Sequence, residues 1–157
     1  MITKTAPHQY YFEVQLNWQR GHKGIITAND VKDTLKVATP SLFPGGVPDM
    51  WSPEHLFLGA LCSCFMTTCF AIAEKQQLSI THFTCNAIGH VALSDGHMEF
   101  VTADLYPKIT VESERDIAAA NEVLLKTYHH SIVANSVKTL LVNHGEVLVE
   151  NHHKQNK

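Results

Sequence analysis

The sequence has no excess of basic residues, because 12 Lys and Arg stand against 15 Asp and Glu, for a formal net charge of −3. A surface that binds nucleic acid or an anionic membrane needs such an excess, so we expect neither partner. Residues 1–9 lack the apolar stretch of a signal peptide. No apolar run approaches the ~18–20 residues that span a bilayer. We therefore expect a soluble, cytoplasmic protein with no membrane partner.

Several motifs are also missing. The four cysteines are too few for a disulfide scaffold. There is no glycine-rich phosphate loop and no nucleophile elbow, which argues against nucleotide and hydrolase functions. Eleven histidines are present, but no Cys-x-x-Cys or His-x-x-x-His spacing accompanies them. Cys62 and Cys64 would point to different faces of one helix. We therefore expect no metal site and no cofactor.

What is present fits one globular domain over residues 1–157, with 45% hydrophobic and 17% charged residues. Apolar and polar residues alternate over 12–18, which predicts a half-buried strand. A turn at 20–24 and a returning strand at 25–27 complete a hairpin, and a third strand is expected near 35–38. Residues 40–53 hold four prolines and two glycines, a composition typical of a loop.

A long helix is predicted to follow this loop. Ser52 can cap it, Pro53 suits its first position, and Glu54 lies near the positive end of its dipole. The helix should run to about Lys75 and is apolar almost all round. Such a helix must be covered on every side, and one small sheet cannot do so. We infer that a second copy covers it in a homodimer.

The remaining elements complete an α+β order, β-β-β-α-β-β-α-α-β. Two strands are expected at about 83–93 and 98–111, joined by a turn at Ser94-Asp95-Gly96, with Pro107 breaking or kinking the second. Ser113, followed by Asp116, caps the next helix, whose buried stripe comprises Ile117, Ala120, Val123, Leu124 and Thr127. A short helix at about 132–141, a strand at 147–149 and a frayed polar tail at 151–157 follow.

Two segments carry a family resemblance. Residues 52–64 read SPEHLFLGALCSC, and residues 130–138 read HSIVANSVK. With Trp18 ahead of a Gly-containing turn and the Pro/Gly loop, they resemble the signature of the OsmC/Ohr superfamily. Its members carry Pro-Glu at the start of the central helix and a cysteine ten residues after that Glu. The matching pair here is Glu54 and Cys64, and the resemblance covers nearly the whole chain.

The resemblance implies an intertwined dimer that reduces organic hydroperoxides. Cys64 would attack the peroxide, Glu54 and an arginine would assist its thiolate, and a second cysteine would close a disulfide for an external dithiol to reduce. The family's second cysteine falls at Ser131, whose hydroxyl cannot form a disulfide. Reduction by an external thiol is then expected, and the Cys64 sulfenic acid would persist until a thiol reaches it.

The residues themselves constrain this reading. Cys64 lies too deep in the helix for its dipole to help much, and burial would raise its pKa. A cation must therefore approach the sulfur, and Arg20 and His22, both in this turn, are the candidates. Glu54 and Cys64 are about 15 Å apart along one helix. Antiparallel packing of two such helices would bring Glu54 of one chain near Cys64 of the other.

Other readings stay open. Cys62, Cys69 and Cys85 fit the role of small buried hydrophobes. His130 could line the pocket or simply sit in solvent at a helix end. The alternative function is a non-catalytic relative that binds a small hydrophobic ligand in the dimer pocket. Loss of the second cysteine favours it.

Overall fold

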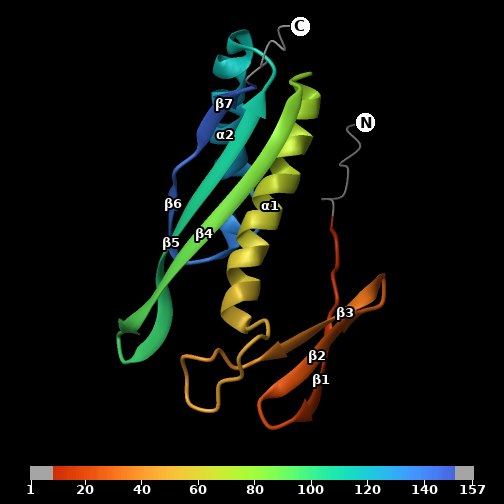
Figure 1. Ribbon diagram of the computed structural model, residues 1–157, viewed down its shortest axis with the longest axis vertical. Helices are drawn as coiled ribbons and strands as arrows, with labels where there is room; N and C mark the ends of the chain where they lie inside the picture. The colour runs from red at the N-terminus through yellow and green to blue at the C-terminus, as the bar shows by residue number, and fades with distance from the viewer. Residues whose placement is uncertain (1–8, 151–157) are drawn as a thin grey trace, which may run out of the picture. The chain divides into compact units, whose positions relative to one another are not determined.

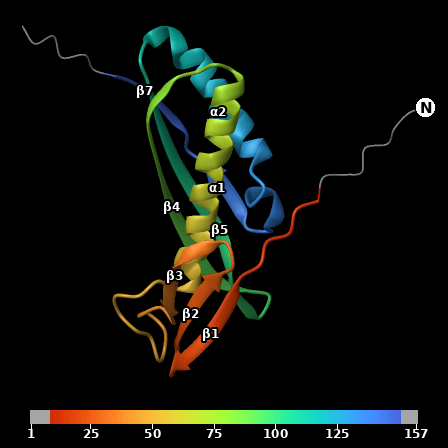
Figure 2. The same ribbon diagram turned by 90° about the vertical axis from the view of Figure 1, so that its right-hand side faces the viewer.

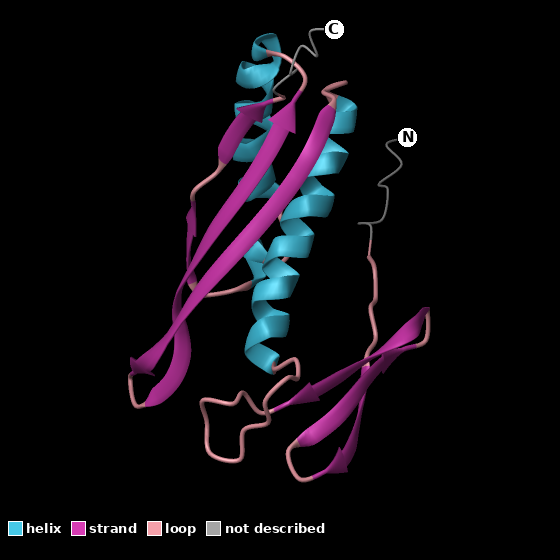
Figure 3. Ribbon diagram, viewed as in Figure 1, coloured by secondary structure: helices cyan, strands magenta, loops and turns pink. Residues whose placement is uncertain are grey.

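The computed structural model describes residues 9–150, and the chain divides into two compact units, Met1–Leu56 and Phe57–Lys157. Each unit has its own β-sheet (Figure 3). The predicted tail at 151–157 lies outside the described residues. That residues 1–157 form one domain stays a prediction. The elements in chain order are β1 Gln15–Arg20, β2 Lys23–Ala28, β3 Val31–Ala38, α1 Pro53–Lys75, β4 Ile80–Ser94, β5 His97–Val111, η1 Glu114–Asp116, α2 Ile117–His130, η2 Ala134–Ser136, β6 Leu140–Asn143 and β7 Glu146–Val149 (Figure 1).

The first unit is an antiparallel meander in the order β1-β2-β3. Gly21 turns the first hairpin with a φ of 53°, a conformation that glycine adopts without steric cost. The strand predicted over 12–18 begins later, at Gln15. The cause is the length of its partner, because Gln15 pairs with Thr27 and β2 ends at Ala28.

Helix α1 begins and ends where its capping residues predict. The Ser52 hydroxyl is buried and accepts a hydrogen bond from the His55 backbone N–H at 3.4 Å. Glu54 lies in the first turn and Lys75 in the last, as the helix dipole favours. Only Leu61, Phe65, Cys69 and Ala73 are fully buried. The rest of this apolar helix is partly or wholly uncovered in a single chain.

By length and composition alone, α1 is apolar enough to cross a membrane. The expectation that no apolar run is long enough was therefore too strict. Its buried residues, however, pack in the core of the second unit against β5 and α2. A core helix of a soluble domain passes the same test of composition, so α1 is weak evidence for a membrane span.

The second unit packs α1 and α2 on one face of a four-stranded sheet (Figure 2). β4 and β5 form a long antiparallel hairpin, and its turn holds Asp95 and Gly96 at positive φ as predicted. β6 and β7 each pair with β5 in parallel. Inward side chains from one face of β5 meet both helices, and the buried cluster comprises Leu61, Phe65, Cys69, Ala73, Ala103, Leu105, Ile109, Val111, Ala120, Val123 and Leu124.

Pro107 was expected to break or kink β5, and the strand continues through it without a break. It is buried and pairs with Cys85 inside the hairpin. On the other side of β5, β6 pairs as far as Leu105 and β7 starts pairing at Lys108. Pro107 therefore lies in the gap between the pairing of β6 and that of β7. Its missing N–H costs no ladder hydrogen bond there.

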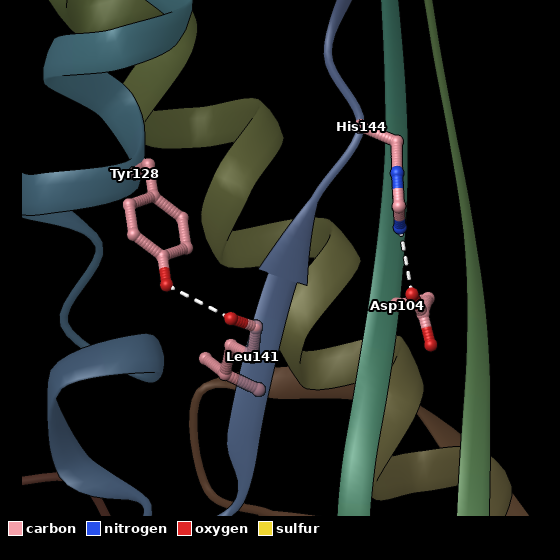
Figure 4. A network of polar contacts seen from close by, with 4 residues as sticks. All are labelled: Asp104, Tyr128, Leu141 and His144. Atoms are coloured by element: carbon pink, nitrogen blue, oxygen red, sulfur yellow. Dashed lines mark hydrogen bonds and ion pairs between the residues drawn. The ribbon is translucent and has the colours of Figure 1, made fainter.

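The prediction of a short helix at 132–141 was also wrong. Only the single turn η2 forms, and β6 takes the end of the segment. Pairing with β5 outweighs the local helical tendency. The Tyr128 hydroxyl donates to the Leu141 carbonyl at 3.0 Å, and His144 bonds Asp104 at 2.6 Å just after the strand (Figure 4). These contacts fix β6 as extended chain.

Candidate active site

The Cys64 sulfur lies against the C-terminal end of α2. Its Sγ accepts a hydrogen bond from the Ser131 hydroxyl at 3.2 Å and from the Val133 backbone N–H at 3.5 Å. Cys64 is partly exposed, whereas Ser131 is buried. The structure thus brings together the two positions that the two sequence motifs single out, although 67 residues separate them.

The chain after α2 is shaped to aim these donors. Ser131 is the C-cap of α2 in an extended conformation, and its N–H bonds the Thr127 carbonyl at 3.0 Å. The chain then turns back, because the Asn135 N–H bonds the Ser131 carbonyl and the Ala134 N–H approaches the Ser131 hydroxyl at 3.5 Å. This turn fixes the Ser131 hydroxyl in place against the sulfur.

The pKa of Cys64 is lowered from its ordinary value. Burial of the sulfur raises it, but hydrogen bonds from Ser131, the Val133 N–H, Thr68 and the Ile132 N–H together outweigh burial. Donors that face a sulfur stabilise its thiolate more than its thiol, and the thiolate is the nucleophilic form. Cys64 is therefore activated within one chain by dipoles alone.

Replacing Ser131 with alanine is expected to raise the pKa of Cys64, because it removes the largest single favourable contact on the thiolate. Thiolate absorbance followed against pH in the variant measures the change. Ser63→Ala is the matched control, since the Ser63 hydroxyl bonds the Ala60 carbonyl on the same helix. Equal titration curves for Ser131→Ala and the unchanged protein would contradict the assignment.

Glu54 and His22 lie together in the first unit. Both line an open, mostly apolar hollow of about 360 Å³ with Leu16, Trp18 and Phe43. One Glu54 carboxylate oxygen, Oε2, is buried and has no hydrogen-bond partner among residues 9–150. A buried carboxylate oxygen without a donor is costly, so this side chain is poised to receive one.

His22 and Arg20, the two candidate cations, differ in how firmly they are held. The His22 Nδ1 lies 3.1 Å from the Thr39 hydroxyl. A Cβ at Gly45 would come within 2.6 Å of the His22 ring, so the loop closes over it only because that residue is glycine. Arg20 ends β1, is exposed, and forms no salt bridge with the described part of the chain.

The structure also gives the positions of the remaining candidate residues. His130 is the exposed last residue of α2. Cys69 is buried, and burial raises the pKa of its thiol. Across residues 9–150, no three His, Cys, Asp or Glu side chains gather closely enough to hold a metal ion. Sequence reasoning missed Thr68, which its spacing of four from Cys64 could have indicated. It also missed the Ile132 and Val133 donors, which are backbone groups without a sequence signal.

These features define an α+β protein built on one long apolar helix that carries a hydrogen-bonded, activated cysteine. The chain belongs to the OsmC family, because residues 46–143, more than half of its length, match the family model described as OsmC-like protein. The resemblance drawn from the two motifs is thereby confirmed at the level of the family.

Individual relatives are distant in sequence but close in fold. The chain is similar to an OsmC-like protein of unknown function from Vibrio cholerae, with a TM-score of 0.78, 20% identity and coverage of 87% of this chain and 99% of that one. An organic hydroperoxide resistance protein from Elizabethkingia anophelis gives a TM-score of 0.73 at 16% identity, covering 92% and 100%. The uncharacterized protein YmaD of Bacillus subtilis (strain 168) is 19% identical over 85% of this chain and 89% of its own length.

Proposed function

We propose that this protein is a peroxiredoxin-like oxidoreductase that reduces organic hydroperoxides, with Cys64 as the attacking residue. The observation that carries the proposal is the pair of hydrogen bonds from Ser131 and Val133 to the Cys64 sulfur. The Cys64 thiolate attacks the terminal peroxide oxygen and the O–O bond breaks. The alkoxide takes a proton and leaves as an alcohol, and Cys64 is left as a sulfenic acid.

Family membership and a similar structure named as an organic hydroperoxide resistance protein support this substrate class. We place the proposed antioxidant activity in the cytoplasm.

An external thiol completes the proposed cycle. The Ser131 hydroxyl lies 3.2 Å from the Cys64 sulfur but cannot form a disulfide. A small thiol or dithiol therefore condenses with the sulfenic acid and releases water. A second thiol then attacks this mixed disulfide, which returns the Cys64 thiol and releases the oxidised reductant as a disulfide.

Arg20 is proposed as the cation that assists the thiolate, with Glu54 orienting it through the carboxylate oxygen that finds no donor among the described residues. Replacing Arg20 with alanine is expected to raise the pKa of Cys64, because an approaching positive charge favours the thiolate. The rate of iodoacetamide reaction with Cys64 against pH measures it. If the pKa holds in Arg20→Ala and rises in His22→Ala, the cation is His22 instead.

A homodimer is proposed because large apolar side chains stand uncovered in one chain. Trp18 is 73% exposed, Leu16 is 62% exposed, and Met66 on α1 is 40% exposed. A soluble monomer rarely exposes such a set of large apolar side chains to water. Sedimentation at low micromolar concentration is expected to give a dimer. A compact, folded monomer under those conditions would end the idea.

The alternative is a non-catalytic relative that binds a small hydrophobic ligand in the dimer pocket, and the mostly apolar hollow beside Glu54 supports it. Stopped-flow mixing of reduced protein with cumene hydroperoxide, followed by mass mapping of Cys64, separates the two functions. The peroxidase rapidly loses the Cys64 thiol and regains it with dithiothreitol. The binding relative keeps the Cys64 thiol on that timescale, and cumyl alcohol would bind to it without loss of that thiol.

A further inference from the structure

Helix α1 and strand β4 face each other over much of their length. The rings of Phe70 on α1 and Phe83 on β4 lie 5.9 Å apart between centroids. Further along, a Cβ at Gly89 of β4 would lie 3.0 Å from a methyl carbon of Leu58 on α1. The side of β4 that carries residues 83 and 89 therefore packs on α1.

Cys62 and Cys85 lie between these two contacts, one on each element. Cys62 is one turn after Leu58, so it shares that side of the helix. Cys85 is two residues after Phe83, so it shares the inward side of the strand. Both thiols are partly exposed. The Cys85 S–H donates a hydrogen bond to the Cys62 sulfur.

This hydrogen bond makes the two thiols chemically unequal. It lowers the pKa of Cys62 to about 7, against the opposing effect of burial. The same hydrogen bond, with burial and the nearby Cys62 charge, raises the pKa of Cys85. One sulfur is thus a thiolate near neutral pH while its neighbour keeps a proton, which is the arrangement of a reactive dithiol. Sequence reasoning had treated both as small hydrophobes.

We propose that Cys62 and Cys85 form a second redox site, a dithiol that an organic hydroperoxide converts into an internal disulfide. This second site rests on the proposed function for its oxidant, an organic hydroperoxide, but it uses none of the residues of that function. It requires that the two neighbouring side chains rotate to bring their sulfurs into bonding distance.

The steps balance with one hydroperoxide. The Cys62 thiolate attacks the terminal peroxide oxygen, the O–O bond breaks, and the alcohol leaves with a proton from water. The Cys85 sulfur then attacks the Cys62 sulfenic sulfur, and the Cys85 proton leaves with the hydroxyl as water. Two thiols are oxidised to one disulfide, and the peroxide is reduced to alcohol and water.

The two sites lie on different sides of α1. Cys64 faces the turn after α2, whereas Cys62 faces β4. Residues two apart on a helix point in directions about 200° apart. Cys64 therefore has no route to the Cys85 sulfur within this unit, and the two sites take up oxidising equivalents independently.

The deciding experiment uses the full-length Cys64→Ser variant, treated with one equivalent of cumene hydroperoxide. The expected result is an intact mass lower by two hydrogen atoms and a peptide map that links Cys62 to Cys85. Cys64→Ala provides the same readout with a different side chain. An added oxygen on Cys62, an unchanged mass, or a link to Cys69 would each overturn the proposal.

The Cys85→Ser variant keeps the two proposals apart, because it retains Cys64 and lacks the pair. Oxidation of Cys64 there shows that the Cys64 proposal stands whatever happens at Cys62. A Cys64 that stays reduced there refutes the Cys64 proposal while leaving the second site to be judged by Cys64→Ser.

A second measurement tests the contact itself. In the unchanged protein, Cys62 alkylation is expected to rise with pH through a midpoint near 7. In Cys85→Ala the midpoint should move up toward ~8.5, the ordinary value for a free cysteine, because the donor is gone. A midpoint that does not move would show that the two thiols do not interact, which overturns the proposal.

Discussion

Replacing Cys64 with serine in a Cys62→Ser background is expected to slow catalytic turnover of cumene hydroperoxide with dithiothreitol by roughly 1000-fold or more relative to Cys62→Ser alone, as removal of a nucleophile does in other enzymes. A serine hydroxyl is not ionised near neutral pH and cannot become a sulfenic acid. Peroxide consumption under excess reductant measures the rate. The fold should persist, because Cys64 is partly exposed and outside the buried cluster.

Cys69→Ala is the matched control for this variant. Cys69 lies on the same helix but is buried, and burial raises its pKa, so its loss should cost stability rather than turnover. Turnover in the Cys62→Ser, Cys64→Ser double variant that remains above about a tenth of that in Cys62→Ser would contradict the assignment of Cys64.

Replacing Ser131 with cysteine is expected to create a disulfide with Cys64 on oxidation. The Ser131 hydroxyl already lies 3.2 Å from the Cys64 sulfur. The link would close a loop of 67 residues, which by loop entropy raises the free energy of unfolding of the oxidised form by about 4 kcal/mol. Non-reducing mass mapping and thermal unfolding with and without dithiothreitol measure the two effects.

The same variant should also resist over-oxidation. With a thiol beside it, the Cys64 sulfenic acid condenses before excess peroxide can carry it to sulfinic acid. Ser136→Cys serves as the control, because Ser136 is exposed and its hydroxyl bonds the Ile132 carbonyl rather than Cys64. A disulfide in Ser136→Cys but not in Ser131→Cys would show that the turn after α2 lies elsewhere.

Much of the fold could be predicted because its signals are local. Ser52, Pro53 and Glu54 mark the start of α1 through capping and dipole preferences. Asp95 and Gly96 mark the hairpin turn through their tolerance of positive φ. In each case the residues that decide the structure are neighbours in the chain.

The predictions of secondary structure failed where residues distant in the sequence determine the structure. β6 is extended because β5 lies beside it, and Pro107 is tolerated because β6 ends before it and β7 begins after it. Neither fact can be read from the residues themselves. The later start of β1 has the same cause, since β2 is too short to pair with Phe12.

The candidate site divides in the same way. Cys64 and Ser131 were found because two motifs with characteristic residues mark them. The Val133 N–H and the contact of Cys62 with Cys85 depend on how α1 meets α2 and β4. Arg20, His22 and Glu54 belong to the first unit and Cys64 to the second, so their proposed cooperation across the site stays a prediction.

The most direct measurement is the site of the first oxidation. Reduced protein is mixed with one equivalent of cumene hydroperoxide, quenched within the first turnover with a sulfenic-acid trapping reagent, and mapped by mass. We predict that the trapped oxygen lies on Cys64 and that dithiothreitol removes it when added before the trap. A Cys64 that stays reduced while peroxide disappears, or while none is consumed, would contradict the account.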